Sequence, residues 1–120
     1  MIIGIIGSRR RDTDKDKNLI EKELLKIMND NKDIIICSGG CPRGGDRFAE
    51  SLAAKYHLKK IIHRAEWDKH GKVAGFIRNT LIAEESDILI ASVASDRTGG
   101  TEDTIKKFKK MKPNGEIILV

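Results

Sequence analysis

Aromatic residues are scarce in this chain, and long apolar runs are absent. Three Phe, one Trp and one Tyr occur among 120 residues, so no base-stacking platform for single-stranded nucleic acid is evident. The apolar runs fall far short of the roughly 20 residues that cross a bilayer. The N-terminus also lacks a basic region followed by an extended apolar stretch. We therefore expect a soluble, cytoplasmic protein with no membrane partner.

Cysteine and histidine are too few and too scattered to indicate a metal site. Cys37 and Cys41 lie on either side of an expected strand end, and His57, His63 and His70 form no local pair with them. A structural metal site needs about four ligands at recognisable spacing, and disulfides are rare in cytosolic proteins. We predict no metal, no disulfide and no cofactor.

Two common nucleotide motifs are missing as well. The first expected strand contains Gly4 and ends in Gly7-Ser8-Arg9, which does not reproduce the dinucleotide-binding fingerprint. No glycine-rich loop closes with the Lys-Ser or Lys-Thr pair of a P-loop. The sequence therefore supports neither NAD binding in the dehydrogenase manner nor hydrolysis of a nucleoside triphosphate.

The net charge of +5 raises the question of a nucleic-acid partner. The lysines are spread over expected helix surfaces and mixed with acids. The densest cluster, within residues 106–112, shares its helix with the inward-facing Ile105, Phe108 and Met111. A solvated surface explains most of this charge, so nucleic-acid binding is possible but not favoured.

What the chain does contain is a regular alternation of apolar runs and helical spacing. Its length suits a single domain spanning residues 1–120. Continuous apolar runs are typical of parallel strands that are covered on both faces. They lie at Ile2–Ile6, Ile34–Cys37, Leu58–Ile62, Ile88–Ala91 and Ile117–Val120. We predict an α/β fold, a Rossmann-like three-layer α/β/α domain with a mostly parallel five-stranded sheet.

Three of the expected strands end in polar, glycine-bearing loops. These loops contain Gly7-Ser8-Arg9, residues Ser38–Asp46, and Thr98-Gly99-Gly100-Thr101. Glycine lets a backbone approach a ligand closely, and a helix start favours phosphate. Loops after parallel strands meet at the carboxyl edge of the sheet, near the point where strand order reverses. We therefore predict a site for a phosphate-bearing small molecule at this edge.

Arginines beside these loops are the candidate phosphate partners. Arg9, Arg43 and Arg78 stand next to predicted pocket loops, and guanidinium groups bind phosphate in a bidentate way. Arg10 and Arg11 follow in what looks like a solvated loop. Trp67, in a polar segment, could rest on a bound base, on a partner subunit or on the core. Asp46 could bind a ribose hydroxyl or compensate the dipole of its helix.

The ordered set of these residues resembles the YspA-related group of the SLOG superfamily over nearly the whole chain. The resemblance rests on Gly7-Ser8-Arg9, Ser38-Gly39-Gly40, Arg43-Gly44-Gly45-Asp46-Arg47, Trp67, Gly71, Ala74-Gly75, Arg78-Asn79, Asp87 and Gly100-Thr101. The superfamily includes Lonely Guy phosphoribohydrolases, DprA proteins that load single-stranded DNA, and domains proposed to sense nucleotide-derived signals. The resemblance implies a nucleotide-like ligand and a homodimer.

The chain departs from the hydrolases of this superfamily in one motif. Their fourth strand is followed by Pro-Gly-Gly-x-Gly-Thr-x-x-Glu. Here Gly100-Thr101 matches the Gly-Thr, but the preceding loop is longer and lacks the proline, and Thr104 occupies the position of the glutamate. Cleavage of an N-glycosidic bond needs a carboxylate. The candidate catalytic residues, if the chain is an enzyme, are Arg78, Asp46, Glu66 and Asp103.

We therefore predict a domain that binds a nucleotide or nucleotide-derived phosphate ligand, for sensing or sequestration. The first alternative is cleavage of a nucleoside phosphate at its N-glycosidic bond, and the second is single-stranded nucleic-acid binding. The expected ligand-binding residues are Gly7, Ser8, Arg9, Ser38, Gly39, Gly40, Arg43, Gly44, Gly45, Asp46, Trp67, Arg78, Asn79, Gly99, Gly100 and Thr101.

Overall fold

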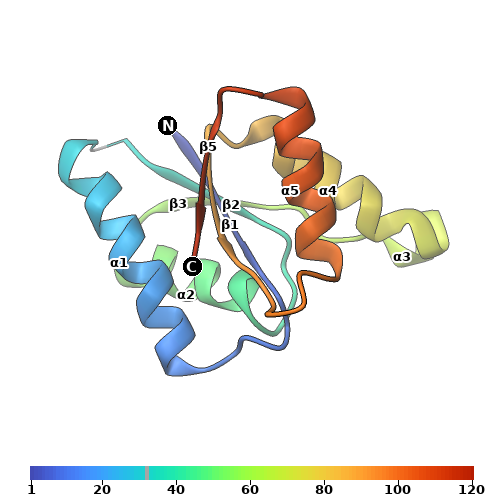
Figure 1. The fold of residues 1–120 in the computed structure, drawn as a ribbon, viewed down its shortest axis with the longest axis horizontal. Helices are drawn as coiled ribbons and strands as arrows, with labels where there is room; N and C mark the ends of the chain where they lie inside the picture. The colour runs from blue at the N-terminus through green and yellow to red at the C-terminus, as the bar shows by residue number, and fades with distance from the viewer. Residues whose placement is uncertain (32) are drawn as a thin grey trace.

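The computed structural model describes residues 1–31 and 33–120 of the chain. Within these residues, five strands alternate with helices (Figure 1). The strands are β1 (Ile2–Gly7), β2 (Ile35–Ser38), β3 (Lys59–Ile62), β4 (Ile88–Ser92) and β5 (Glu116–Leu119). The helices are α1 (Asp14–Asp30), α2 (Gly45–Lys55), α3 (Trp67–His70), α4 (Ala74–Glu85) and α5 (Gly100–Met111), with a 3₁₀ turn at Gly71–Val73. No helix in the described part of the chain is both long enough and apolar enough to cross a membrane.

The strands form one sheet in the order β3-β2-β1-β4-β5. Every neighbouring pair is parallel, which confirms the predicted fold class and shows a sheet that is parallel throughout. After β3 the chain crosses to the other side of β1, so strand order reverses between β1 and β4. In sheets of this kind ligands bind outside the carboxyl ends of the strands at the reversal.

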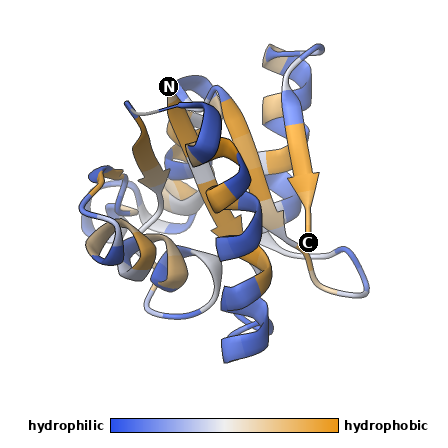
Figure 2. Cartoon of the chain, turned by 90° about the vertical axis from the view of Figure 1, so that its left-hand side faces the viewer, coloured by the Kyte–Doolittle hydropathy of each residue, from blue (hydrophilic) through white to orange (hydrophobic). Residues whose placement is uncertain are grey.

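Helices cover both faces of the sheet (Figure 1). Helices α1 and α2 pack on one face against Ile3, Ile5 and Ile36, while α4 and α5 pack on the other face against Cys37 and Leu89. Neighbouring strand residues enter opposite cores because strand side chains alternate between faces. This two-sided burial explains the unbroken apolar runs, and Figure 2 shows hydrophobic strands between helices that are largely hydrophilic outside.

Polar side chains fix where two of the elements begin. The Thr13 hydroxyl accepts the amide of Asp16 at 3.2 Å, and the Asp16 carboxylate accepts the amide of Thr13 at 3.2 Å, which together cap α1. The Asp87 carboxylate accepts the amide of Ile2 at 2.8 Å. Asp87, one of the residues behind the family resemblance, therefore has a structural role at the start of β1.

Gly45, the first residue of α2, packs directly on the end of β1. A Cβ atom there would overlap the carbonyl carbon of Ile6 and the amide nitrogen of Gly7. We predict that Gly45→Ala lowers the free energy of unfolding by about 1–3 kcal/mol, because the overlap involves backbone and pushes α2 away from the sheet. Urea unfolding followed by circular dichroism measures the change.

Gly75→Ala is the matched control for this substitution. In α4 the nearest atom to an added Cβ at position 75 belongs to the Trp67 ring, at an ordinary contact distance of 3.4 Å. Alanine also has the higher helix propensity, so this variant should be as stable as the wild type or slightly more stable. A Gly45→Ala protein as stable as Gly75→Ala would contradict the prediction.

Candidate functional site

A cleft of about 380 Å³ lies at the carboxyl ends of β1 and β4, where strand order reverses. This volume is within the range of small-molecule sites. Its walls come from the loops after β1, β2 and β4, from α4 and from the start of α5. The lining residues are Ile6, Gly7, Ser8, Arg9, Arg10, Cys41, Asp46, Arg78, Asn79, Ile82, Thr98, Gly99, Gly100, Thr101 and Thr104.

The cleft brings together predicted binding residues from all three loops and from α4. Those in its wall are Gly7, Ser8, Arg9, Asp46, Arg78, Asn79, Gly99, Gly100 and Thr101. The predicted residues outside the wall are Ser38, Gly39, Gly40, Arg43, Gly44, Gly45 and Trp67. Ser38 and Gly39 lie directly behind it, since they bond to Asp46 and Arg78. The ligand contacts of the whole set stay a prediction.

The glycine-rich loop before α2 already holds a carboxylate of the protein itself. Asp12 Oδ1 accepts the amide of Gly44 at 2.7 Å and the Nε of Arg47 at 3.0 Å. The pKa of Asp12 lies below its ordinary value, mainly because its carboxylate accepts the Gly44 amide. Desolvation acts in the opposite direction, and Arg47 lowers the pKa further. The Gly44 amide, which the sequence predicts to bind a ligand anion, is therefore already bonded to the Asp12 carboxylate. Sequence analysis misses Asp12, because its partners lie on a distant loop.

Arg10 and Arg11, expected on a solvated loop, both make specific contacts. The Arg10 guanidinium donates to both carboxylate oxygens of Asp96, at 2.8 and 2.7 Å, and to the Thr98 hydroxyl at 3.0 Å. The Thr98 hydroxyl in turn donates to Asp96 at 2.8 Å, and the bonds from Arg10 and then from Thr98 hold the pKa of Asp96 well below its ordinary value. Arg11 donates from Nε to Asp16 at 3.0 Å. Arg10 thus joins the loop after β1 to the loop after β4, and its charge is matched by Asp96.

Asp46 contributes a buried carboxyl group to the cleft wall. Its Oδ2 accepts the amide of Cys41 at 3.1 Å, and its Oδ1 lies 2.9 Å from the Ser38 hydroxyl oxygen. That hydroxyl also lies 2.6 Å from the carbonyl oxygen of Ile5. The single proton of the Ser38 hydroxyl cannot serve both acceptors. A protonated Asp46 could donate to the Ser38 hydroxyl, which would then donate to the Ile5 carbonyl. Burial raises the pKa of Asp46 above its ordinary value, against the opposing effects of the Cys41 and Ser38 bonds and of the Arg78 charge.

Arg78 and Asn79 connect α4 to the loops on either side. Arg78 donates from Nε to the Asn79 side-chain oxygen at 3.0 Å and from Nη1 to the Gly39 carbonyl at 3.3 Å. Asn79 donates to the Gly100 carbonyl at 3.3 Å and to Asp103 at 3.0 Å. Both partners of Arg78 are neutral, and it takes part in none of the ion pairs found among the described residues. The nearest carboxyl group is that of Asp46, whose pKa the Arg78 charge lowers without a direct ion pair.

The start of α5 forms another part of the cleft wall. Gly99 precedes the helix with a φ of 110°, and no side chain caps its first turn. Gly100 and Thr101, which carry the first amides of the helix, line the cleft. The first amides of a helix have no partner within it, and the helix dipole adds partial positive charge there. The start of α5 is thus also suited to an anion.

A model of the YspA, cpYpsA-related SLOG family matches residues 3–70, more than half of the chain. The chain belongs to this family. The family resemblance inferred from the sequence is thereby confirmed, and membership implies a small-molecule ligand. The chain is also similar to the Gene 61 protein of Mycobacterium phage D29, with 26% identity over 102 residues that cover 80% of this chain and 81% of that protein. No solved structure is a significant match.

The candidate catalytic carboxylates of this SLOG protein do not gather in one place. Asp46 lines the cleft, but Glu66 lines a second hollow of about 370 Å³ beside α4. The Asp103 carboxylate is outside the cleft wall and accepts the Lys107 ammonium at 2.8 Å. Thr104, at the position of the motif glutamate, lines the cleft with its hydroxyl bonded to the helix backbone. Among the residues that the structure describes, Asp46 is the carboxyl of the cleft wall.

Trp67 begins α3 rather than lying in a loop, and its side chain is exposed. The Trp67 side chain is 55% exposed and lines neither hollow. It therefore does not pack in the core, and contact with a bound base and contact with a partner subunit stay the two alternatives. Val73 and Phe76, on the neighbouring turn and helix, are also more than half exposed. The SLOG protein therefore presents an apolar surface at Trp67, Val73 and Phe76, beside the cleft-forming helix α4.

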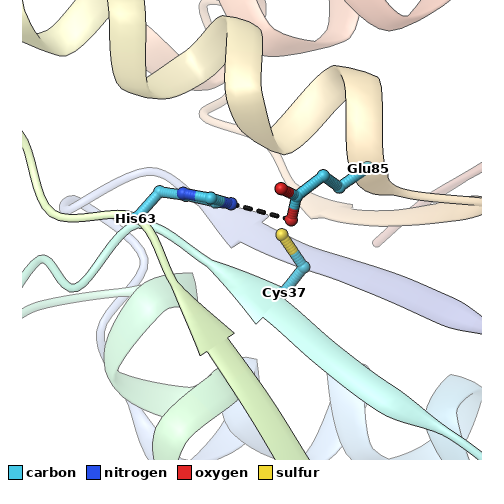
Figure 3. Close-up of side chains that lie close together, drawn as sticks. All are labelled: Cys37, His63 and Glu85. Atoms are coloured by element: carbon cyan, nitrogen blue, oxygen red, sulfur yellow. Dashed lines mark hydrogen bonds and ion pairs between the residues drawn. The ribbon is translucent and has the colours of Figure 1, made fainter.

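A second cluster, which sequence analysis misses, lies between the sheet and the end of α4. Cys37 of β2, His63 after β3 and Glu85 of α4 point toward one another (Figure 3). His63 Nε2 is 2.8 Å from Glu85 Oε2. Burial, and then the charge of Glu85, raise the pKa of Cys37 to about 11. No local spacing joins Cys37 to His63. The parallel register that pairs Cys37 with Ile61 brings them together.

We predict that Asp46→Asn keeps the fold and is at least as stable as the wild type at neutral pH. An Asn can donate to the Ser38 hydroxyl and accept from the Cys41 amide, as the protonated acid would. Because the folded pKa of Asp46 is raised above its ordinary 3.8, the folded state binds more protons and wild-type stability falls as pH rises through that window. The difference in stability between Asp46→Asn and the wild type should therefore increase in favour of the variant as pH rises from 3.8 through the folded pKa. Thermal unfolding of both proteins at a series of pH values measures this difference.

Asp12→Asn is the control, because the pKa of Asp12 is shifted in the opposite direction from that of Asp46. The folded pKa of Asp12 lies below its ordinary 3.8, so its carboxylate contributes stability at neutral pH that is lost as pH falls through the folded pKa. This variant should be less stable than the wild type at neutral pH, with the difference disappearing in acid. Parallel pH profiles for wild type and Asp46→Asn would refute the assignment of a raised pKa to Asp46.

Proposed function

We propose that the cleft binds the phosphate of a nucleotide or nucleotide-derived small molecule, for sensing or sequestration. One observation carries the proposal: the uncapped start of α5 and the guanidinium of Arg78 converge on the same cleft. Helix-start amides and arginine are both common partners of phosphate. Arg9, which also lines the cleft, can add a second positive charge from the loop after β1.

The rest of the cleft supports a ligand with an uncharged part as well as a phosphate. Ile6 and Ile82 give it apolar wall, and Asp46 gives it one buried polar group. When it is protonated, this carboxyl group can hydrogen-bond a sugar hydroxyl or a base nitrogen without repelling a nearby phosphate. This combination of cationic, apolar and buried polar groups fits a nucleoside phosphate better than inorganic phosphate alone.

We predict that Arg78→Ala weakens nucleotide binding by roughly 10- to 150-fold, the equivalent of about 1.5–3 kcal/mol for hydrogen bonds to a charged group. The measurement is isothermal titration calorimetry with the tightest binder from a panel of AMP, ADP, ADP-ribose, cyclic ADP-ribose and NAD. Circular dichroism should show the variant to be folded, because the hydrogen bonds that it loses, to the Asn79 side chain and the Gly39 carbonyl, join Arg78 to neutral groups and belong to no ion pair.

Arg64→Ala provides the matched control. Arg64 also follows a strand at the carboxyl edge of the sheet, but it is outside the cleft and contacts the Gly40 carbonyl at 3.2 Å. Its loss should leave affinity nearly unchanged. Equal affinities for Arg78→Ala and the wild type would reject the proposed phosphate site. Arg9→Ala and Arg43→Ala, in separate titrations, test the other two arginines that the sequence predicts.

Hydrolysis of a nucleoside phosphate is the alternative, and the environment of Asp46 is the observation that favours it. A carboxyl group with a raised pKa is suited to general-acid catalysis. Native mass spectrometry of the protein with the same panel, followed over hours, separates the two functions. We expect a stable complex with intact nucleotide. Steady release of free base that is abolished in Asp46→Asn would establish the hydrolase instead.

Nucleic-acid binding and homodimer formation both stay predictions. Two lysines of the last helix and its end are engaged within the chain, since Lys107 pairs with Asp103 and Lys112 donates to the Glu84 carbonyl. These contacts reduce the charge available to a nucleic acid. For the dimer, the apolar surface at Trp67, Val73 and Phe76 is the part of the protein that supports pairing.

A further inference from the structure

We propose that Cys37, His63 and Glu85 form a zinc-binding site, separate from the cleft. Their ligand atoms, one thiol sulfur, one imidazole nitrogen and one carboxylate oxygen, lie within 4.8 Å of one another. They come from three elements that are far apart in sequence, and Figure 3 shows all three directed at a common point. None of them lines the cleft, so this inference does not depend on the proposed function.

The spacing of these atoms is close to that of a metal centre. Zinc–sulfur and zinc–nitrogen bonds of about 2.3 and 2.0 Å in tetrahedral geometry place two ligand atoms about 3.4–3.6 Å apart. His63 and Glu85 now lie at hydrogen-bond distance, 2.8 Å, and would separate slightly, while the widest pair would close by roughly 1 Å to reach the tetrahedral spacing. The Glu85 side chain is 37% exposed, which gives it room to make this adjustment.

The chemistry of the donors selects the metal. A thiolate, an imidazole and a carboxylate form a mixed sulfur, nitrogen and oxygen set that suits zinc, whereas magnesium and calcium take oxygen ligands. The negative charges of the thiolate and of Glu85 balance a divalent cation. Lys112 lies nearby, but its ammonium is held by the carbonyl oxygens of Glu84 and Ser86. Three protein ligands leave a fourth position for water.

The burial of Cys37 argues against a nucleophilic cysteine as the purpose of the cluster. Cys37 is fully buried, in a core cluster with Ile82 and Phe108. A substrate carbon could not reach its sulfur without opening that core. A metal ion is small enough to enter from the side of Glu85 and His63, whose side chains are partly exposed.

A metal at this position would connect parts of the fold that the cleft relies on. It would tie β2 and the residue after β3 to the last turn of α4, the helix that presents Arg78 and Asn79 to the cleft. Zinc binding to the folded state alone also raises stability by mass action. We therefore expect zinc to raise the thermal unfolding midpoint of the wild-type chain after treatment with a chelator.

Cobalt titration of the chelator-treated, full-length protein tests the proposal directly. We expect one Co²⁺ per chain, visible bands of tetrahedral coordination, a sulfur-to-cobalt charge-transfer band in the near ultraviolet, and displacement of the cobalt by zinc. Cys37→Ser should lose the charge-transfer band, and Cys41→Ser, which removes the other thiol, should keep it. Cobalt binding without that band, or a band that survives in Cys37→Ser, would overturn the proposal.

Glu85→Gln and His63→Gln keep the test decisive if Cys37→Ser does not fold. Both positions are partly exposed, and each variant should weaken cobalt binding by more than the roughly 10- to 100-fold typical of groups that only support a metal ligand. His70→Gln is the control, because His70 contacts Glu66 instead of this cluster, and it should bind cobalt as the wild type does. Unchanged affinity in both Glu85→Gln and His63→Gln would also reject the site.

Discussion

Crowding around the carboxyl end of β1 is the constraint on which the cleft depends. Gly45 of α2 lies against the backbone of Ile6 and Gly7 with no space for a side chain, and a Cβ on Gly7 would lie 2.9 Å from that of Ser92. The Ser8 amide continues the sheet by donating to the Ser92 carbonyl at 2.8 Å. With its neighbours this close on both sides, the chain turns outward just after Ser8. That turn makes the loop after β1 a wall of the cleft.

The two helix starts at this edge of the sheet have different roles. At the start of α2, the Gly44 amide is satisfied by Asp12, and Gly45 is used for packing on β1. At the start of α5, no side chain caps the first turn, and its residues face the cleft. We therefore place the proposed anion site at α5, although the glycine-rich loop before α2 is the more prominent feature of the sequence. The ion pair of Arg10 with Asp96 fixes the loop that leads to α5.

Local patterns made the fold predictable, while contacts between distant segments limited what could be said of the site. Runs such as Ile2–Ile6 indicate a strand because burial on both faces of a parallel sheet leaves a continuous apolar signal. The pairing of Arg10 with Asp96 has no such signal, since it depends on where two loops end in space. Cys37 and His63 meet only because β2 and β3 pair in one particular register, which strand prediction does not supply.

Two carboxyl positions decide how the electrostatics of the cleft relate to chemistry. At the position of the hydrolase glutamate, Thr104 donates its hydroxyl to the Gly100 carbonyl, and the two acidic residues in the first turn of α5, Glu102 and Asp103, form ion pairs with Arg97 and Lys107. Asp46 enters from the β2 side, and burial raises its pKa toward the neutral form. Under the proposed function, the positive charges of Arg78 and of the α5 dipole would hold the phosphate. With threonine at the position of the motif glutamate, α5 does not supply there the carboxylate that would stabilise a developing sugar cation, which supports the proposal that the nucleotide is retained intact.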